Sequence, residues 1–389
     1  MGRKYQVISG DGHVETPPDT FVKYVPSKWA DRAPRLIHLP EGGEGWLIEG
    51  MPLLQNGQNI TGRGPVRMSG ASYFNDDGSP AEGAGDARQR LREQDIDGVD
   101  AEVLFPPVFA SRFIEAIEDR DVYRSMVRAY NTFLAHDYCS VAPDRLIGNA
   151  TLPVTGIEDA LDELEFAHEA GLRSVCFYQF PNGGGGPLPE DDRFWERCLE
   201  LGIAISPHFG FGLPTAPYPG KPGTDTSSVQ LAAALAQRVG NHHPVYCMAQ
   251  LITSGVFDRF PEIKFYFAES NIAWLPWAMF TFDDNLDLFG PAFGANLKMK
   301  PSEYIAKHCY FGIVRDPIGL AYHEMIPMDN VMFGSDFPHS VGSYPKSREF
   351  LDEAFVDIPD EVKRKVLLET PAAYYGLDLD ADITETPAA

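Results

Sequence analysis

The sequence is poor in cysteine, poor in basic residues and free of long apolar runs. Only five of its 389 residues are cysteines, and they are widely spaced with no C-x-x-C pair. An odd number of cysteines without such a pair argues against a disulfide framework and against a zinc ribbon. Each cysteine stands among apolar neighbours, so we interpret all five as small buried hydrophobic residues.

Positive charge is scarce relative to negative charge. Lysine and arginine total 32 against 56 aspartates and glutamates, which gives a net charge of −24. No compact basic cluster interrupts this surface, so we exclude nucleic acids and anionic membranes as partners and expect a small-molecule substrate. No apolar stretch approaches the roughly 18 residues of a membrane span, and Met1–Tyr5 leads into a strand-like run rather than a signal sequence. We therefore expect a cytoplasmic protein.

Short β-rich runs alternate with longer helical patterns through most of the chain. In residues 156–171, for example, Ile157, Leu161 and Leu164 recur at helical spacing and Gly171 ends the pattern. The alternation predicts an α/β protein with a parallel sheet, and eight strands favour closure into a (β/α)8, TIM-like barrel. The alternative is a doubly wound open sheet. The eight candidate strands are Tyr5–Ser9, Ala101–Phe105, Leu146–Leu152, Leu172–Tyr178, Ile203–Pro207, Ile263–Ala268, Cys309–Ile313 and Asn330–Gly334.

We expect one barrel domain over residues 1–378, followed by a polar tail over 379–389. Between the first two strands, residues 38–86 are crowded with Gly, Asn and Pro, which predicts an inserted cap or hairpin. Its apolar residues, Trp46 among them, need a surface to pack on. We expect the insertion to cover the carboxyl-terminal mouth of the barrel, with Trp46 at the substrate. The alternative is a surface hairpin that serves dimerisation.

Side chains that can bind a metal follow three of the predicted strands. Asp11 and His13 follow the first strand and, being two residues apart in extended chain, point the same way. His208 follows the fifth strand and Asp336 the eighth. Taken singly, Asp336 could cap a helix and His208 could be a hydrogen-bonded core histidine. Because all four fall at strand ends, where a barrel keeps its active site, we predict that they bind one divalent metal ion.

Other polar residues at strand ends are candidates for catalysis or substrate binding. Glu269 and Asn271 follow the sixth strand, and Tyr178 and Gln179 follow the fourth. We assign Asn271, Tyr178 and Gln179 to orienting the substrate, from their position alone.

Two further residues lie close in sequence to the predicted ligands. His339 follows Asp336, and Glu15 follows His13. Each either supports the ligands or serves the structure, and His339 is a further catalytic candidate.

The ordered set Asp11-x-His13, Pro207-His208, Glu269 and Gly334–His339 resembles the amidohydrolase superfamily. More narrowly, the chain looks like the amidohydrolase-related branch that contains aminocarboxymuconate-semialdehyde decarboxylase. The similarity covers nearly the whole chain and includes three further segments, namely Asp95–Asp100, Leu152-Pro153 and Arg259-Phe260-Pro261.

The resemblance implies a distorted (β/α)8 barrel with one metal ion, commonly zinc, in a homodimer. Asp11 and His13 match the family's His-x-His pair, His208 matches its strand-five ligand, and Asp336 matches its strand-eight aspartate. Two positions depart from the pattern. Asp11 replaces a histidine, which makes the site more anionic and admits Mn²⁺ or Fe²⁺. Glu269 stands where the decarboxylases use a histidine in proton transfer.

From the donor set and the resemblance we predict a metal-dependent hydrolase of a small, cyclic or aromatic substrate. Metal-activated water would cleave an amide, a lactone or an activated carbon–carbon bond, with Asp336 as acid/base. Glu269 would be a second acid/base or a further ligand. The alternative function is non-oxidative decarboxylation of an aromatic or enoic carboxylic acid. A second alternative is a barrel that binds a metal or a ligand without turnover.

Overall fold

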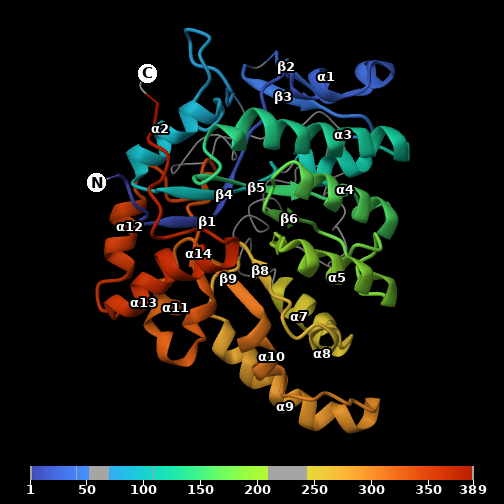
Figure 1. Ribbon diagram of the computed structural model, residues 1–389, viewed down its shortest axis with the longest axis vertical. Coiled ribbons are helices and arrows are strands. Elements are labelled where there is room, and N and C mark those ends of the chain that lie inside the picture. The colour runs from blue at the N-terminus through green and yellow to red at the C-terminus, as the bar shows by residue number, and fades with distance from the viewer. Residues whose placement is uncertain (1, 41, 52–69, 108, 209–242, 388–389) are drawn as a thin grey trace.

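The computed structural model describes residues 2–40, 42–51, 70–107, 109–208 and 243–387 (Figure 1). Within them, eight parallel strands form two sheets, with the orders β1-β4-β5-β6-β7 and β10-β9-β8. The strands are β1 (Ile8–His13), β4 (Ala101–Phe105), β5 (Leu146–Thr151), β6 (Ser174–Cys176), β7 (Ala204–Ile205), β8 (Phe265–Phe267), β9 (Cys309–Ile313) and β10 (Val331–Phe333).

The two sheets lie edge to edge on both sides, so that together they form one curled parallel sheet. β1 packs beside β10, and β7 packs beside β8. Two backbone hydrogen bonds join the carboxyl ends of the first pair, from His13 N to Phe337 O (2.7 Å) and from Asp336 N to Asp11 O (2.9 Å). On the other side Ala268 N donates to Pro207 O over 3.4 Å. The curl therefore brings the ends of distant strands together.

The α/β alternation and the position of every predicted strand are confirmed, but the extent of β1 is a correction. The first strand was expected to end at Ser9, whereas it runs on to His13. Gly12 and His13 pair with Leu104 and Phe105 of β4 after an irregularity in the register that follows Ser9. Gly10 and Gly12 lower the strand propensity of this segment, so the hydrophobic pattern of the sequence did not indicate a strand beyond Ser9.

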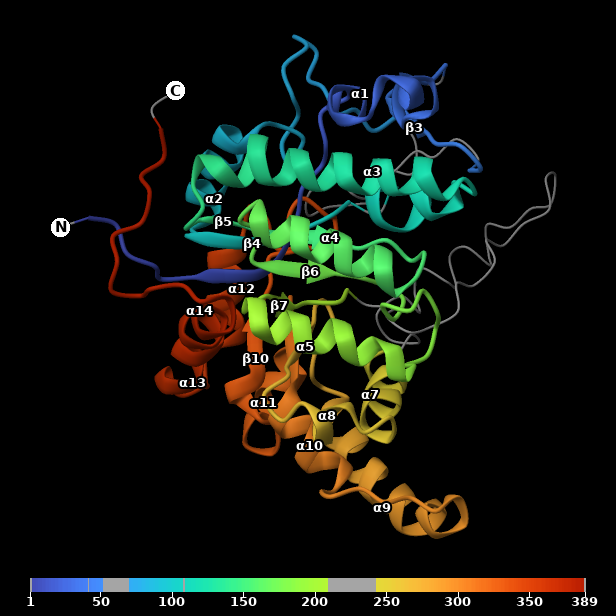
Figure 2. The ribbon, with the colours of Figure 1, turned by 45° about the vertical axis from the view of Figure 1, so that its right-hand side comes forward.

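Helices cover the outer face of the curled sheet (Figures 1 and 2). α2 shows how the sequence sets their ends, because the Asp86 carboxylate accepts a hydrogen bond from Gln89 N and Gly98 closes the helix at φ 73°. The helices are α1 (Thr20–Tyr24), α2 (Ala87–Asp97), α3 (Arg120–Phe133), α4 (Ile157–Glu169), α5 (Asp192–Leu201), α7 (His243–Thr253), α8 (Val256–Arg259), α9 (Leu275–Phe293), α10 (Pro301–His308), α11 (Pro317–Ala321), α12 (Ser347–Ala354), α13 (Asp360–Arg364) and α14 (Thr370–Tyr375).

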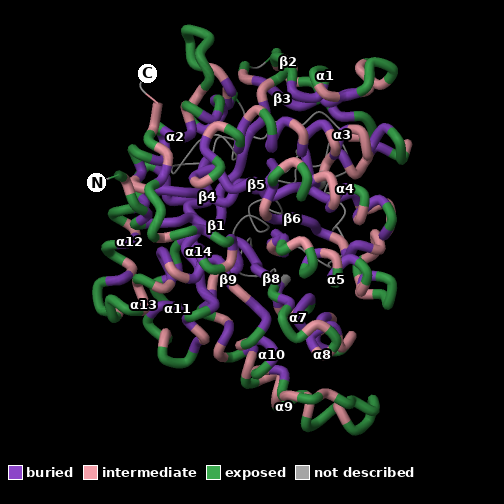
Figure 3. Tube along the Cα trace, viewed as in Figure 1, coloured by how far each residue is buried: buried purple, intermediate pink, exposed green. Residues whose placement is uncertain are grey.

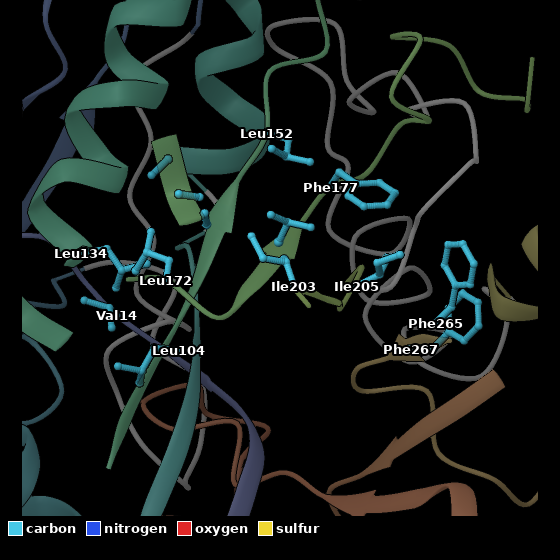
Figure 4. Close-up of a cluster of buried hydrophobic side chains, with 14 of the residues drawn as sticks. Val14, Leu104, Leu134, Leu152, Leu172, Phe177, Ile203, Ile205, Phe265 and Phe267 are labelled. Atoms are coloured by element: carbon cyan, nitrogen blue, oxygen red, sulfur yellow. The ribbon is translucent and has the colours of Figure 1, made fainter. Parts of the chain in front are cut away.

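A buried apolar layer separates the strands from these helices. Figure 4 shows Val14 close to Leu104, Leu134 and Leu172, and all four are almost fully buried. A smaller cluster, which includes Phe105, fills the inner face. Figure 3 shows the same division, with buried strands inside and exposed residues toward the far end of α9. None of the described helices is both long enough and apolar enough to span a membrane.

Part of the predicted insertion is a β-hairpin. β2 (Arg35–His38) pairs antiparallel with β3 (Glu44–Leu47), so the hairpin begins before residue 38. Trp46 on β3 is fully buried and donates from Nε1 to the Tyr73 hydroxyl over 3.2 Å. Residues 41 and 52–69 of the insertion lie outside the described residues.

The C-terminal segment 379–387 docks against the N-terminus. Ile383 is 5% exposed, and its backbone N donates to Arg3 O over 3.0 Å. Thr384 donates to the Asp144 carboxylate from both its backbone N (2.6 Å) and its hydroxyl (2.7 Å). The segment expected to be a polar tail therefore contributes an apolar side chain to the core.

We expect deletion of residues 379–389 to lower the free energy of unfolding by about 3–7 kcal/mol, the sum for one buried side chain and the three hydrogen bonds above. One buried aliphatic side chain contributes about 1.5–3 kcal/mol, and each hydrogen bond adds about 0.5–1.5 kcal/mol. Urea denaturation followed by circular dichroism measures the change. Deletion of residues 388 and 389 alone is the control. Equal stability of the long deletion and this control would show that the docked segment contributes nothing.

Candidate metal centre

The first two candidate ligands lie within β1 rather than after it. Asp11 and His13 are 0% and 1% exposed, and Nε2 of His13 lies 3.6 Å from Oδ1 of Asp11. Between them Gly12 packs against α2 and β4, where an added Cβ would meet Arg90 Nη2 and Glu102 Oε1 at 3.0 Å. A larger residue between the two ligands would therefore require Arg90 and Glu102 to shift by a few tenths of an ångström.

His13 is oriented by a backbone contact on its far side. Its Nδ1 lies 3.1 Å from the carbonyl oxygen of Pro106, which favours the Nδ1–H tautomer and leaves Nε2 to accept. Nε2 is buried with no hydrogen-bond partner among the described residues. It lies 3.4 Å from Oδ1 of Asp336, and the His13 and His208 ring centroids are 5.1 Å apart.

All four predicted ligands meet at this point. Asp11, His13 and His208 place one donor atom each within 4.8 Å of one another, and His13, Asp336 and His339 form a second such group that shares His13. The two groups come from β1 and from the segments that follow β7 and β10, which the curl brings together. The structure therefore brings the four predicted side chains close together. Their role as metal ligands stays a prediction.

Asp336 is held in an unusual backbone conformation next to His339. Its φ is 54°, a left-handed value that Asp tolerates better than most residues. Its Oδ1 lies 2.9 Å from Nδ1 of His339, whose ring stacks on that of His13 at 3.9 Å. Burial alone would raise the pKa of Asp336, but His339 and His13 outweigh it and hold the pKa well below its usual range. Asp336 is therefore a carboxylate with two histidines beside it.

Glu269 reaches the same region from the end of β8, and Asn271 follows it two residues later. Both adopt left-handed backbone conformations, with φ of 54° and 51°. Oε2 of Glu269 lies 3.8 Å from Nε2 of His208. Oδ1 of Asn271 is buried without a hydrogen-bond partner in the described part of the chain, so it can accept a hydrogen bond from a bound molecule.

Contacts of two predicted substrate-binding residues, Tyr178 and Trp46, lead toward this cluster. The Tyr178 ring lies 6.1 Å from that of His208. Gln179 is partly exposed. Trp46 contacts the hydroxyl of Tyr73, which in turn donates to Oε2 of Glu15 over 3.3 Å.

Glu15 lies two residues beyond His13 and is fully buried. Burial raises its pKa to about 8, although the hydrogen bond from Tyr73 opposes this shift. Through this hydrogen bond Tyr73, a residue of the insertion, lies next to Glu15, which follows β1.

The donor set fits a divalent cation. It combines imidazole nitrogens with carboxylate oxygens, a mixture that Zn²⁺, Mn²⁺ and Fe²⁺ all accept. The carboxylates of Asp11, Asp336 and Glu269 lie buried within this region, and a cation would neutralise their charge. The buried acceptor Nε2 of His13 points to the same conclusion.

Sequence reasoning missed the residues that surround this cluster. Ser335, Glu102 and Arg90 are buried and hydrogen-bonded to one another or to the backbone next to the ligands. Arg90 and Ser335 are 245 positions apart, so no local pattern could have joined them. The segment Asp95–Asp100, which lies between Arg90 and Glu102, contributed to the family resemblance, but it gave no sign that these two residues pair.

The fold and the cluster define an α/β protein with a candidate metal centre at the carboxyl ends of parallel strands. Residues 82–377 match the model of the amidohydrolase family, and the chain belongs to this family. The recognition of the family from Asp11, His208, Glu269 and Asp336 is thereby confirmed.

Several relatives of the chain are known. The γ-resorcylate decarboxylase of Rhizobium sp. (strain MTP-10005) is 26% identical over 203 residues, which cover 50% of this chain and 58% of that protein. An amidohydrolase from Mycobacterium avium subsp. paratuberculosis K-10 has a TM-score of 0.68 at 17% identity, over 96% of this chain and 99% of its own. The dihydroxybenzoic acid decarboxylase of Polaromonas sp. JS666, solved with manganese and the inhibitor 2-nitroresorcinol, has a TM-score of 0.61 at 19% identity, over 97% and 98%.

These relatives overturn the prediction of a hydrolase. The curated relative is a non-hydrolytic enzyme, a decarboxylase, and the metal-containing structure belongs to a decarboxylase as well. The physical reason for the error is that the donor set is the same for both reactions, because a divalent ion polarises an oxygen whichever bond is broken. The ion in that structure is manganese, so the expectation of zinc has no support from it.

Proposed function

We propose that the chain is a metal-dependent, non-oxidative decarboxylase of an aromatic carboxylic acid. The observation that carries the proposal is the buried Asp336–His339 pair, whose Oδ1 and Nδ1 atoms lie 2.9 Å apart, directly against the candidate ligands. The decarboxylase relatives support the same reaction.

Asp11, His13, His208 and Asp336 would hold one divalent ion, and Mn²⁺ is the first ion to test because a related structure contains it. A bound cation would supply positive charge against the carboxylate and hydroxyl oxygens of the substrate. Glu269, 3.8 Å from His208, would orient this ligand or contact the substrate.

Decarboxylation requires a proton at the carbon that loses CO2. The bond between ring carbon and carboxylate breaks, its electron pair stays on the ring carbon, and that carbon takes up a proton. We assign the delivery of this proton to the Asp336–His339 pair acting together, because Oδ1 of Asp336 and Nδ1 of His339 lie 2.9 Å apart, so that a proton can pass between them. Solvent then returns one proton to the pair, so the reaction consumes one proton and releases one CO2.

Aromatic side chains beside the ligands support a flat substrate. The Phe105 ring lies 5.3 Å from the His208 ring and 5.9 Å from the His13 ring, and the Tyr178 ring lies 6.1 Å from that of His208. Such rings stack on or pack edge-to-face with an aromatic acid. The buried Oδ1 of Asn271 would accept a hydrogen bond from a ring hydroxyl.

The proposal includes the remaining expectations for the architecture. We propose a complete (β/α)8 barrel as a single domain over residues 1–378, and a homodimer. The contact from Tyr73 to Glu15 supports the insertion 38–86 as a cap over the site, with Trp46 as the support behind Tyr73.

The test is a substrate panel offered to the chain loaded with Mn²⁺. The panel holds benzoic acids with different hydroxyl positions, together with amide and lactone substrates. We expect CO2 and the corresponding phenol to appear in equal amounts from at least one hydroxybenzoic acid, and nothing from the chelator-treated protein. Turnover of an amide or a lactone without CO2 release from any acid would contradict the proposal.

A further inference from the structure

A buried network of hydrogen bonds holds the residues directly before and after Asp336. On one side, Ser335 donates from its backbone N to Ser9 Oγ over 2.8 Å and from its hydroxyl to Glu102 Oε1 over 2.9 Å. On the other side, the Phe337 carbonyl accepts from Arg90 Nη2 over 3.0 Å and from His13 N over 2.7 Å.

Glu102 on β4 is the centre of this network. Its Oε2 accepts from Arg90 Nε over 2.7 Å and from Gln94 Nε2 over 2.9 Å, while its Oε1 accepts from Ser335. Glu102 is 2% exposed, Arg90 1% and Ser335 0%, so the ion pair is screened from solvent. One carboxylate thus ties helix α2 and strand β4 to the loop that carries Asp336.

We propose that Glu102 is a positioning residue for the metal centre, acting through Ser335 and Arg90. Asp336 lies in the left-handed region at φ 54°, a conformation that persists only where its surroundings enforce it. The network fixes the residues directly before and after it, and thereby the direction of its carboxylate toward His13 and His339. The inference rests on the proposed function, because it requires that Asp336 be a metal ligand.

The chain offers a matched control in Glu163. This glutamate is 4% exposed and, like Glu102, accepts from an arginine (Arg128 Nε, 2.9 Å) and from an amide (Asn131 Nδ2, 2.8 Å). It lies on α4, on the outer face of the sheet. Glu163→Gln therefore perturbs a comparable buried carboxylate away from the cluster.

The experiment measures the affinity for Mn²⁺ alone, by isothermal titration and by the electron paramagnetic resonance signal of free Mn²⁺. We expect Glu102→Gln to weaken Mn²⁺ binding by about 10–100-fold, the usual effect of removing a residue that supports a ligand, and Glu163→Gln to leave it unchanged. If Glu102→Gln does not fold, Ser335→Ala removes the single hydroxyl that joins Glu102 to the loop, and we expect at least a tenfold loss.

Two results would overturn the inference in different ways. A folded Glu102→Gln, or in its place Ser335→Ala, that binds Mn²⁺ as tightly as the unmodified chain shows that the network does not position the centre. An unmodified chain that binds no Mn²⁺ overturns the proposed function, and the positioning role with it.

Discussion

Replacing Asp336 with asparagine is expected to lower kcat/KM for decarboxylation by about 10²–10⁴-fold, the usual contribution of general acid–base catalysis. Asparagine keeps the volume and one oxygen, but it cannot carry a proton to the ring carbon. Steady-state kinetics at saturating Mn²⁺ measure the loss, with the metal content determined on the same sample, because Asp336 is also a candidate ligand.

The matched control for this variant is Asp159→Asn. Asp159 is a buried aspartate on α4 that pairs with Arg120 Nη2 at 2.6 Å, on the outer face of the sheet. We expect it to retain the turnover of the unmodified chain. An Asp336→Asn variant that is loaded with metal and turns over within about threefold of the unmodified chain would show that Asp336 delivers no proton.

Replacing His208 with alanine is expected to weaken Mn²⁺ binding by more than 100-fold. Loss of a residue that only hydrogen-bonds to a metal ligand already lowers the metal affinity by about 10–100-fold, and His208 is a candidate ligand itself. Activity should fall to the level of the metal-free protein. His308→Ala is the control, because His308 is equally buried but stacks on Phe257 at 4.4 Å and contacts the Ile263 carbonyl. We expect that variant to lose stability and keep its metal.

A third histidine distinguishes the two groups of donors that share His13. In our assignment His339 takes part in proton transfer and is not a ligand, so His339→Ala should bind Mn²⁺ with at most a small loss and turn over slowly. If His339→Ala releases the metal while His208→Ala keeps it, the ion belongs to the group of His13, Asp336 and His339.

The strands could be predicted from the sequence because buried parallel strands are short apolar runs. Ala101–Phe105 and Cys309–Ile313 match the structure residue for residue, and the other predicted runs overlap the observed strands. The error in β1 arose at Gly10 and Gly12. Neither residue favours a strand by itself, and the extended chain there pairs with Leu104 and Phe105 of β4, which a local pattern does not show.

The candidate ligands could be predicted because they end or follow strands, and the curl of the sheet brings strand ends together. Three things could not be predicted. The hydrogen bonds of Glu102 depend on tertiary packing, the contact between Tyr73 and Glu15 depends on how the insertion folds back, and the reaction depends on the substrate. The pattern Asp11-x-His13 with His208 and Asp336 is compatible with hydrolysis and with decarboxylation alike.

The most direct test of a decarboxylase is the fate of the proton at the ring carbon. The Mn²⁺-loaded chain is incubated in D2O with a hydroxybenzoic acid that it consumes, and the phenol is analysed by mass spectrometry and NMR. We expect one carbon-bound deuterium at the vacated position for each CO2 released, because the proton that the Asp336–His339 pair delivers has to be replaced from solvent in every turnover. A product that carries an oxygen from solvent and no new carbon–deuterium bond, with no CO2 released, would contradict this account.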